Sequence, residues 1–283
     1  MLNILITGAN GQLGNEIKEC AAKIGKNKYF YTDIDTLDIT QKQDILRFVK
    51  QNNINVTVNC AAYTQVDKAE DDKQQADLIN HIAVKNLAES AKENNITLIH
   101  ISTDYVFDGN KNIPYTETDT THPIGVYGQT KLQGELAIQK TGGNYLIIRT
   151  SWLYSSFGNN FVKTMLKLTA EKDNLKVVFD QIGTPTYAKD LAQIIIYIIE
   201  NNLFANKQEL YHYSNEGVCS WYDFAMAIKE ISQNNCTIQP CHSDEFSSKV
   251  KRPHFSVLDK TKIKKDFGIE IRYWREALKD CIT

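Results

Sequence analysis

The fold is decided by residues 3–14, which read Asn3-Ile4-Leu5-Ile6-Thr7-Gly8-Ala9-Asn10-Gly11-Gln12-Leu13-Gly14. The apolar run before the first glycine is typical of a buried strand, and apolar residues repeat at helical spacing after the last one. Glycines at such a junction permit a tight turn and let backbone N–H groups at a helix N-terminus approach a pyrophosphate. We therefore predict a dinucleotide site at Gly8, Gly11 and Gly14. The alternative is a glycine-rich turn that binds no ligand.

Short β-branched runs alternate with segments of helical periodicity over the first two thirds of the chain, which predicts repeated βαβ units. The strands are expected at residues 3–7, 29–32, 56–59, 97–102, 145–150 and 176–179. Thr40 and Gln43 form a capping-box pattern that predicts the start of one helix. The predicted fold class is α/β, a Rossmann-type doubly wound parallel sheet, with ligands beyond the carboxyl ends of its strands.

The alternation loosens after about residue 150. A strand candidate at 210–213, a helix at 220–232 and an amphipathic segment at 274–278 predict a smaller C-terminal α/β substrate lobe. We expect residues 1–150 plus about 175–205 to form the NAD(P)-binding Rossmann domain. The lobe would then comprise about 151–174 plus 206–283.

Composition narrows the possible function classes. The chain has 283 residues, of which 42% are hydrophobic, and its 32 Lys and Arg nearly balance 34 Asp and Glu. This excludes a disordered or membrane-spanning chain, and the near-neutral charge does not provide the basic surface that nucleic-acid binding needs. Because the first residues lack the basic and apolar regions of a signal peptide, we expect a cytoplasmic protein without nucleic-acid or membrane partners.

The cysteines give little indication of a metal site. None of the six forms a CxxC pair. Cys236, Cys241 and His242 lie close together in the sequence, but no second pair of ligands follows them. We therefore expect no metal at these residues.

An acidic residue ends the second predicted strand. Asp33 lies nineteen residues after Gly14, where a carboxylate would accept hydrogen bonds from the adenosine ribose hydroxyls and favour NAD. The alternative is a solvated carboxylate in a turn. Since Lys or Arg from elsewhere could receive a 2′-phosphate, the sequence leaves the choice between NADH and NADPH open.

The strongest chemical signal is a Tyr and a Lys spaced by four residues. Tyr127 and Lys131 begin a helical segment, so that they lie one above the other on one face, where an ammonium favours the phenolate. A phenol titrates near 10 without such help. A hydroxyl at the end of the fourth predicted strand, Thr103 or Ser102, could hydrogen-bond a substrate carbonyl. This pattern predicts a catalytic group of Tyr127, Lys131 and Thr103; the alternative is a surface pair on a helix.

These motifs give the chain a family resemblance. It resembles the extended short-chain dehydrogenases/reductases, and among them the dTDP-4-dehydrorhamnose reductase family, over roughly its whole length. The matching segments are Gly8 to Gly14, Leu37 to Thr40, Asn59 to Thr64, Val66 to Glu70, Ser102 to Gly109, Tyr127 to Lys131, Arg149 to Trp152, Gly158 to Val162, Asp180 to Thr186 and Arg252-Pro253.

The resemblance implies reduction of the C4 ketone of dTDP-4-dehydro-β-L-rhamnose to dTDP-β-L-rhamnose, a sugar donor for cell-surface polysaccharide, with NADPH or NADH. Tyr127 would donate the proton, Lys131 would assist it and hold the ribose, and Thr103 would orient the ketone. The cofactor would be lined by Gly11, Gln12, Leu13, Asp38, Ile39, Ala62, Tyr63 and Thr64. The sugar nucleotide would contact Asp104 and Trp152, with Arg252 at its diphosphate; Trp152 could instead simply pack between the lobes.

Other interpretations stay open at this point. An epimerase or another reductase acting on sugar nucleotides shares the glycine loop and the Tyr/Lys pair, and a non-catalytic dinucleotide-binding regulatory subunit shares the fold. Some members of the family are homodimers bridged by Mg²⁺, to which Glu16 corresponds as a ligand. Lys189 stands where a second carboxylate is expected, so that a bridging metal is doubtful.

Overall fold

A six-stranded parallel sheet forms the centre of the computed structural model, which describes residues 1–245 and 250–283. The strands, in spatial order, are β10 (Gln208–His212), β5 (Asn144–Thr150), β4 (Thr97–Thr103), β3 (Val56–Asn59), β1 (Asn3–Thr7) and β2 (Lys28–Thr32). β3, β4 and β5 are almost entirely buried, as expected for parallel strands that are covered on both faces.

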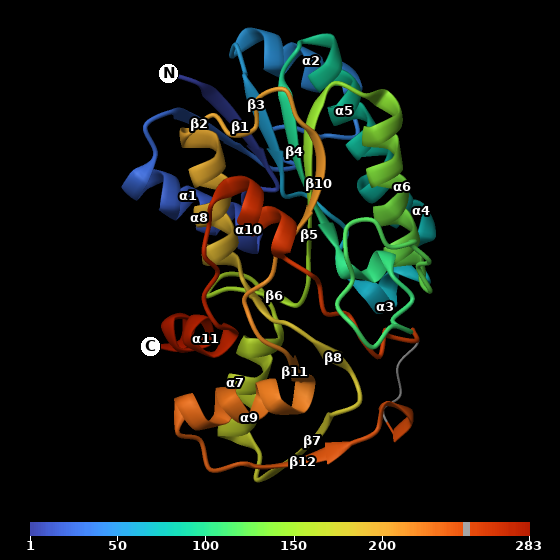
Figure 1. The fold of residues 1–283 in the computed structure, drawn as a ribbon, viewed down its shortest axis with the longest axis vertical. Helices are drawn as coiled ribbons and strands as arrows, with labels where there is room; N and C mark the ends of the chain where they lie inside the picture. Colours follow the sequence, from blue (N-terminus) through green and yellow to red (C-terminus); the bar gives the residue numbers. More distant parts are fainter. Residues whose placement is uncertain (246–249) are drawn as a thin grey trace.

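Helices cover both faces of this sheet (Figure 1). On one face lie α1 (Gln12–Ile24), α8 (Ala188–Glu200) and α10 (Thr261–Phe267), whose apolar residues join one hydrophobic cluster with β1 and β3. On the other lie α2 (Lys42–Gln51), α5 (Ala83–Glu93) and α6 (Val126–Thr141). α1, α2, α5 and α8 turn apolar residues toward the strands, whereas α6 buries a mainly polar face that includes Lys131 and Glu135. Helices on both faces of a parallel sheet confirm the predicted doubly wound α/β fold.

The order of the strands fixes where a ligand can bind. The chain passes from β1 outward to β2 and then returns to place β3 on the opposite side of β1. At this reversal the connections after β1 and β3 leave toward opposite faces, which opens a crevice at the carboxyl ends of the two strands. Four short helical segments complete this half: α3 (Val66–Ala69), α4 (Lys73–Asp77), η1 (Leu78–Ile82) and η2 (Asp104–Val106).

The rest of the chain forms a smaller unit below the sheet in Figure 1. Aromatic and aliphatic residues of its helices form a separate hydrophobic cluster. Its elements are β6 (Leu153–Tyr154), α7 (Phe161–Glu171), β7 (Asn174–Val178), β8 (Ile182–Gly183), β9 (Thr186–Tyr187), β11 (Cys219–Ser220), α9 (Trp221–Ser232), β12 (Thr237–Cys241), η3 (Ser243–Glu245) and α11 (Trp274–Ile282). No helix among the described residues combines the length and the apolar composition that a membrane crossing requires.

Two predicted strands lie in sheets other than those expected. The candidate at 176–179 corresponds to β7, which pairs with β12 outside the central sheet. The candidate at 210–213 corresponds to β10, which pairs with β5 at the edge of the central sheet. Neither strand has the continuous apolar run that marks a central parallel strand, and both are only partly buried. The remaining boundaries of the two domains stay a prediction.

The capping box predicted at Thr40 is also wrong. α2 begins one residue later than that pattern requires, and its N-cap Gln41 makes no side-chain cap. The Thr40 hydroxyl donates instead to Asp38, at 2.8 Å, within the preceding turn. A capping box does occur at α9, where Ser220 and Asp223 cap each other's backbone N–H groups.

Candidate active site

The glycine loop between β1 and α1 has the shape of a phosphate cradle. Gly8 has a φ of 65°, and a Cβ there would lie 2.6 Å from the backbone of Ala61. A Cβ on Gly14 would lie 2.5 Å from the carbonyl oxygen of Gly8. Helix α1 starts at Gln12 with no side-chain cap and no acidic residue in its first turn. Its N–H groups are therefore available to an anion, which fits a dinucleotide pyrophosphate.

Asp33 lies beside this loop, at the carboxyl end of β2. Its carboxylate accepts hydrogen bonds from the backbone N–H groups of Asn10, at 3.0 Å, and Ile34, at 2.9 Å. It therefore orients the loop and stays partly exposed toward the crevice. Asp38 and the buried Ile39 follow in the same connection, and Asp38 is engaged by Thr40.

The segment after β3 lies against the opposite wall of the crevice. Asn80 accepts from the backbone N–H of Tyr63 and donates to its carbonyl, and it also reaches the Thr130 hydroxyl on α6. Tyr63 packs in one apolar cluster with Tyr127. Ala62 and Thr64, the neighbours of Tyr63, are thereby placed near the helix that carries the Tyr/Lys pair.

Thr103 and Tyr127 meet where β4 ends. Thr103 is the last residue of β4 and Tyr127 lies in the first turn of α6. Burial raises the pKa of Tyr127 to about 12, while its hydrogen bond with Thr103 acts to lower it. The phenol is therefore protonated at neutral pH and can donate a proton. The ring of Tyr105 packs edge-on against it, with centroids 5.4 Å apart.

Lys131 lies one turn further along the same face of α6 and is only 2% exposed. Its ammonium donates to the carbonyl of Ile101 on β4 at 2.6 Å and lies 3.5 Å from Nε2 of His100. Burial lowers the pKa of Lys131 to about 8, against the opposing effect of Glu135 and Cys60. Its charge is thus sensitive to pH near neutrality, as expected for a group that assists proton transfer.

A buried ion pair holds α6 against the sheet beneath these residues. Arg149 on β5 donates to both carboxylate oxygens of Glu135, at 2.9 and 2.6 Å, and Ser102 donates to Glu135 at 2.5 Å. The hydroxyl of Ser102 is therefore engaged below the site. Of the two hydroxyls that the sequence left open, the one beside the phenol is Thr103.

A cavity of about 1070 Å³ lies at the smaller unit, with Asp67 of α3 at its edge. Phe161 and Trp221 give it an aromatic wall, and its charged lining combines three cations with three carboxylates: Lys176, Lys251, Arg252, Asp67, Asp180 and Asp244. Arg252 also pairs with Asp67 at 3.1 Å. Aromatic rings beside cations match a ligand that carries a base and phosphates.

The other two predicted substrate residues lie close to this cavity. Asp104, directly after Thr103, is 2% exposed, and burial raises its pKa to about 6. Its carboxylate accepts a hydrogen bond from the Thr103 hydroxyl at 3.1 Å, and hydrogen bonding with Ser256 acts to lower its pKa. Trp152 stacks on Trp221 with ring centroids 3.6 Å apart. The Trp152 ring also lies so close to Gly183 that a Cβ there would be 2.6 Å from it.

Sequence reasoning did not select Trp221. The residue begins α9, about ninety residues after the Tyr/Lys pair, and no local motif surrounds it. Its only signal is an aromatic side chain directly after a helix cap. His100 and Glu135 were missed for a similar reason, because their partners lie on other strands and helices.

The residues at the positions where a bridging Mg²⁺ was considered are engaged in other contacts, as is the neighbouring Asp190. Glu16 accepts a hydrogen bond from Ser155 at 2.7 Å, and Lys189 pairs with Asp280 at 3.2 Å. Asp190 is held by Arg272, at 2.6 Å. Within residues 1–245 and 250–283 no group of three or more His, Cys, Asp or Glu is arranged to hold a metal ion.

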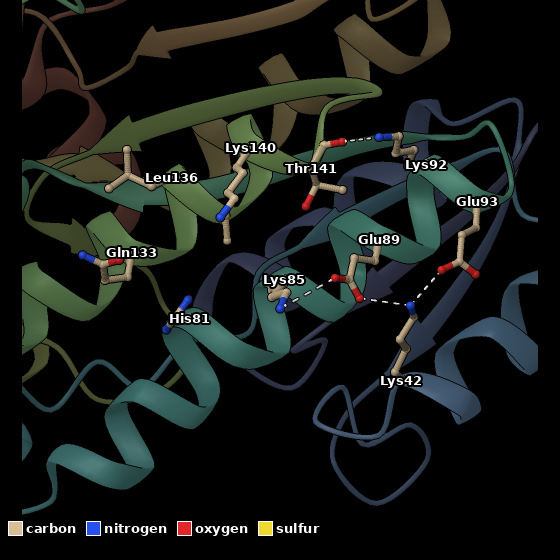
Figure 2. Close-up of a pocket in the computed structure, with 11 residues that line it drawn as sticks. Lys42, His81, Lys85, Glu89, Lys92, Glu93, Gln133, Leu136, Lys140 and Thr141 are labelled. Carbon is tan, nitrogen blue, oxygen red and sulfur yellow. Dashed lines mark hydrogen bonds and ion pairs between the residues drawn. The ribbon is translucent and has the colours of Figure 1, made fainter.

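A second cavity, of about 670 Å³, lies on the outer face of α5 and α6. Figure 2 shows ion pairs among four of its charged side chains: Lys42 bridges Glu89 and Glu93, at 3.0 and 2.7 Å, and Lys85 lies 3.8 Å from Glu89. The α6 residues here belong to the face opposite Lys131. This groove is therefore separate from the catalytic constellation.

Known proteins resemble this chain in sequence and in fold. Residues 2–283 match the family model described as RmlD substrate binding domain. The dTDP-4-dehydrorhamnose reductase of Aggregatibacter actinomycetemcomitans is 41% identical over 99% of this chain and 98% of its own. A solved dTDP-4-dehydrorhamnose reductase from Clostridium acetobutylicum has a TM-score of 0.94 at 43% identity and covers 99% of this chain and 98% of its own. One from Bacillus anthracis, in complex with NADP, has a TM-score of 0.92 at 36% identity, with 99% of both chains covered. The chain belongs to the dTDP-4-dehydrorhamnose reductase family.

Proposed function

We propose that this protein reduces the C4 ketone of dTDP-4-dehydro-β-L-rhamnose to dTDP-β-L-rhamnose, using NADPH or NADH. The observation that carries the proposal is the meeting of Thr103, Tyr127 and Lys131 beside the glycine loop. A purely binding subunit has no use for a buried lysine and a protonated phenol next to a dinucleotide cradle. Membership in the reductase family agrees with this chemistry.

The roles of the residues follow from their positions. The nicotinamide cofactor, when bound, supplies the hydride. Thr103 donates a hydrogen bond to the ketone oxygen and holds it near Tyr127, and the phenol protonates that oxygen as negative charge develops on it. Lys131 supplies positive charge under the phenol and binds the ribose hydroxyls. The hydrogen bonds of Asn80 to the backbone of Tyr63 and to the Thr130 hydroxyl hold the segment after β3 against α6.

We assign the cavity at the smaller unit to the sugar nucleotide. Arg252 pairs with the diphosphate, because a guanidinium matches two phosphate oxygens. The rings of Trp221 and Phe161 offer a flat apolar surface to the base. Asp104 accepts a hydrogen bond from a hydroxyl of the deoxysugar.

The proposal is tested by following absorbance at 340 nm. Purified protein is mixed with NADPH or NADH and with dTDP-4-dehydrorhamnose generated in situ from dTDP-glucose by the upstream enzymes. We expect stoichiometric oxidation with formation of dTDP-rhamnose, and the two rates rank the cofactors. Dinucleotide binding without oxidation would contradict the proposal and favour another sugar nucleotide or a regulatory role. Cofactor that stays bound through purification would favour an epimerase.

A further inference from the structure

His100 is a buried titratable side chain to which the proposed reaction gives no role. It lies in β4, three residues before Thr103, and is 0% exposed. Its ring is between two polar partners: Asn59 on β3, its register neighbour, and Lys131 on α6. Burial, and then the charge of Lys131, lower the pKa of His100 well below its usual value, so that the ring is neutral.

The hydrogen bonds of Asn59 determine which ring nitrogen carries the proton. The amide oxygen of Asn59 accepts from the backbone N–H of Ala61, at 3.2 Å, and from the hydroxyl of Thr7, at 2.7 Å. Its NH₂ group must therefore be the atom that lies 3.0 Å from Nδ1 of His100. An amide NH₂ only donates, so Nδ1 accepts and the ring proton is on Nε2.

The Nε2–H of His100 consequently points toward Lys131, whose nitrogen is 3.5 Å away. An N–H dipole directed at an ammonium repels it, whereas the lone pair of a neutral amine accepts the same hydrogen. The carbonyl of Ile101 holds the lysine nitrogen in place from the strand side at 2.6 Å. The tautomer of His100 therefore favours the form of Lys131 that has lost a proton.

His100 is not a path along which protons leave. Its second nitrogen faces the Asn59 NH₂ group, whose oxygen is occupied by Thr7 and a backbone N–H. A proton taken up by the ring could not be passed on through Nδ1, because the group that Nδ1 faces, the Asn59 NH₂, is itself a donor. The effect of His100 on the reaction must therefore act through the position and charge of Lys131.

We propose that His100 is a positioning residue for the reduction: its Asn59-oriented Nε2–H, directed at the Lys131 nitrogen that the carbonyl of Ile101 holds, sets the pH at which the lysine releases its proton. This rests on the proposed function, in which Lys131 assists Tyr127. The other titratable groups that act on Lys131 are Glu135 on its own helix and Cys60 after β3, and both favour its charged form. Burial opposes them, and the Nε2–H of His100 is inferred to act in the same direction as burial.

The test is the pH profile of kcat for three variants. His100→Gln places an amide NH₂ at about the reach of Nε2 and so keeps a donor toward Lys131. His100→Met has nearly the same length but no donor. His100→Asn keeps the partner of Asn59 but is too short to reach Lys131, and it carries the test if the Met variant does not fold. Thermal unfolding and NADPH binding at pH 7 identify the folded variants.

In the wild type we expect the rate to decline as the pH rises past about 8, because Lys131 then loses its charge. Without the Nε2–H the charged form is less disfavoured, so this decline should move upward by about one pH unit in the Met and Asn variants. The Gln variant should decline near the wild-type pH. Equal profiles in all four proteins, or an equal shift in all three variants, would overturn the proposal.

NADPH binding separates this inference from the proposed function. Lys131 is also the proposed ribose ligand, and its ammonium attracts the anionic dinucleotide, so affinity should fall over the same pH range. A shifted binding curve in the Met variant without turnover in any protein would support the role of His100 and reject the reduction. If the wild type turns over but neither the kcat profile nor the binding curve of the Met variant is shifted, the reduction is supported and the role of His100 is rejected.

Discussion

The two halves of the site are built from different parts of the polypeptide. On the dinucleotide side the contacts come from backbone at the ends of β1 and β3, where Gly8 and Gly14 leave room that a Cβ would fill. On the cavity side they come from the long side chains of Trp221, Phe161 and Arg252, which three separate segments bring together. The first half is therefore sensitive to any added atom, whereas the second can be changed one side chain at a time.

The largest effect should come from the residue where the two halves meet. Tyr127→Phe removes the proton donor and leaves the glycine loop and the cavity in place. We expect kcat to fall by about 10²- to 10⁴-fold, the usual contribution of general acid catalysis. NADPH affinity should stay close to that of the wild type. A variant with near wild-type kcat would reject Tyr127 as the acid.

Both halves depend on the ion pair beneath α6. Glu135→Gln keeps the shape of the side chain but leaves the buried Arg149, which is 4% exposed, without its counter-charge. We expect a loss of about 3–5 kcal/mol in the free energy of unfolding. The matched control is Glu230→Gln in the Arg275 pair, whose side chains are 70% and 41% exposed and whose loss should cost at most about 1 kcal/mol. If a denaturant titration shows that Glu135→Gln and Glu230→Gln lose equal amounts of unfolding free energy, the buried pair is no more important to stability than the exposed one.

The backbone side of the comparison can be tested with a pair of glycines. Gly8→Ala must accept a positive φ and also place a methyl group 2.6 Å from Ala61. Gly268 has nearly the same φ, 62°, but open space around it, so that Gly268→Ala measures the conformational cost alone, about 1–2 kcal/mol. We expect the Gly8 variant to lose more stability than this and to bind NADPH weakly. Equal unfolding free energies with intact NADPH affinity would show that the cradle tolerates a side chain.

What the sequence predicted well is local. A strand followed by glycines and a helix determined the dinucleotide half, because strand, turn and helix are consecutive in the chain. Tyr127 and Lys131 were selected because four residues of helix bring them to one face, and the structure places Tyr127 against Thr103 and Lys131 against the carbonyl of Ile101 on the same strand. The fold class followed from the alternation of strands and helices.

What the sequence did not predict depends on distant partners. β7 and β10 are short, half-exposed strands with similar patterns, and only the neighbours of each decide its sheet. The pattern at Thr40 matched a capping box, but Asp38 competes for the same hydroxyl. Trp221 and His100 acquire their roles through residues more than thirty positions away, Trp152 and Lys131. Spacing along one sequence carries no record of such contacts.

The smallest of these effects should come from the side-chain half. Arg252→Ala removes the cation that we assign to the diphosphate and leaves the Tyr127 region unchanged. A hydrogen bond to a charged group is worth about 1.5–3 kcal/mol, so KM for the sugar nucleotide should rise by about 10- to 100-fold while kcat changes little. Arg275→Ala, on the outside of α11, is the control for loss of one positive charge and should leave KM as in the wild type. If kcat falls and KM is unchanged, Arg252 acts on the chemical step, and the division between a backbone half and a side-chain half fails at this residue.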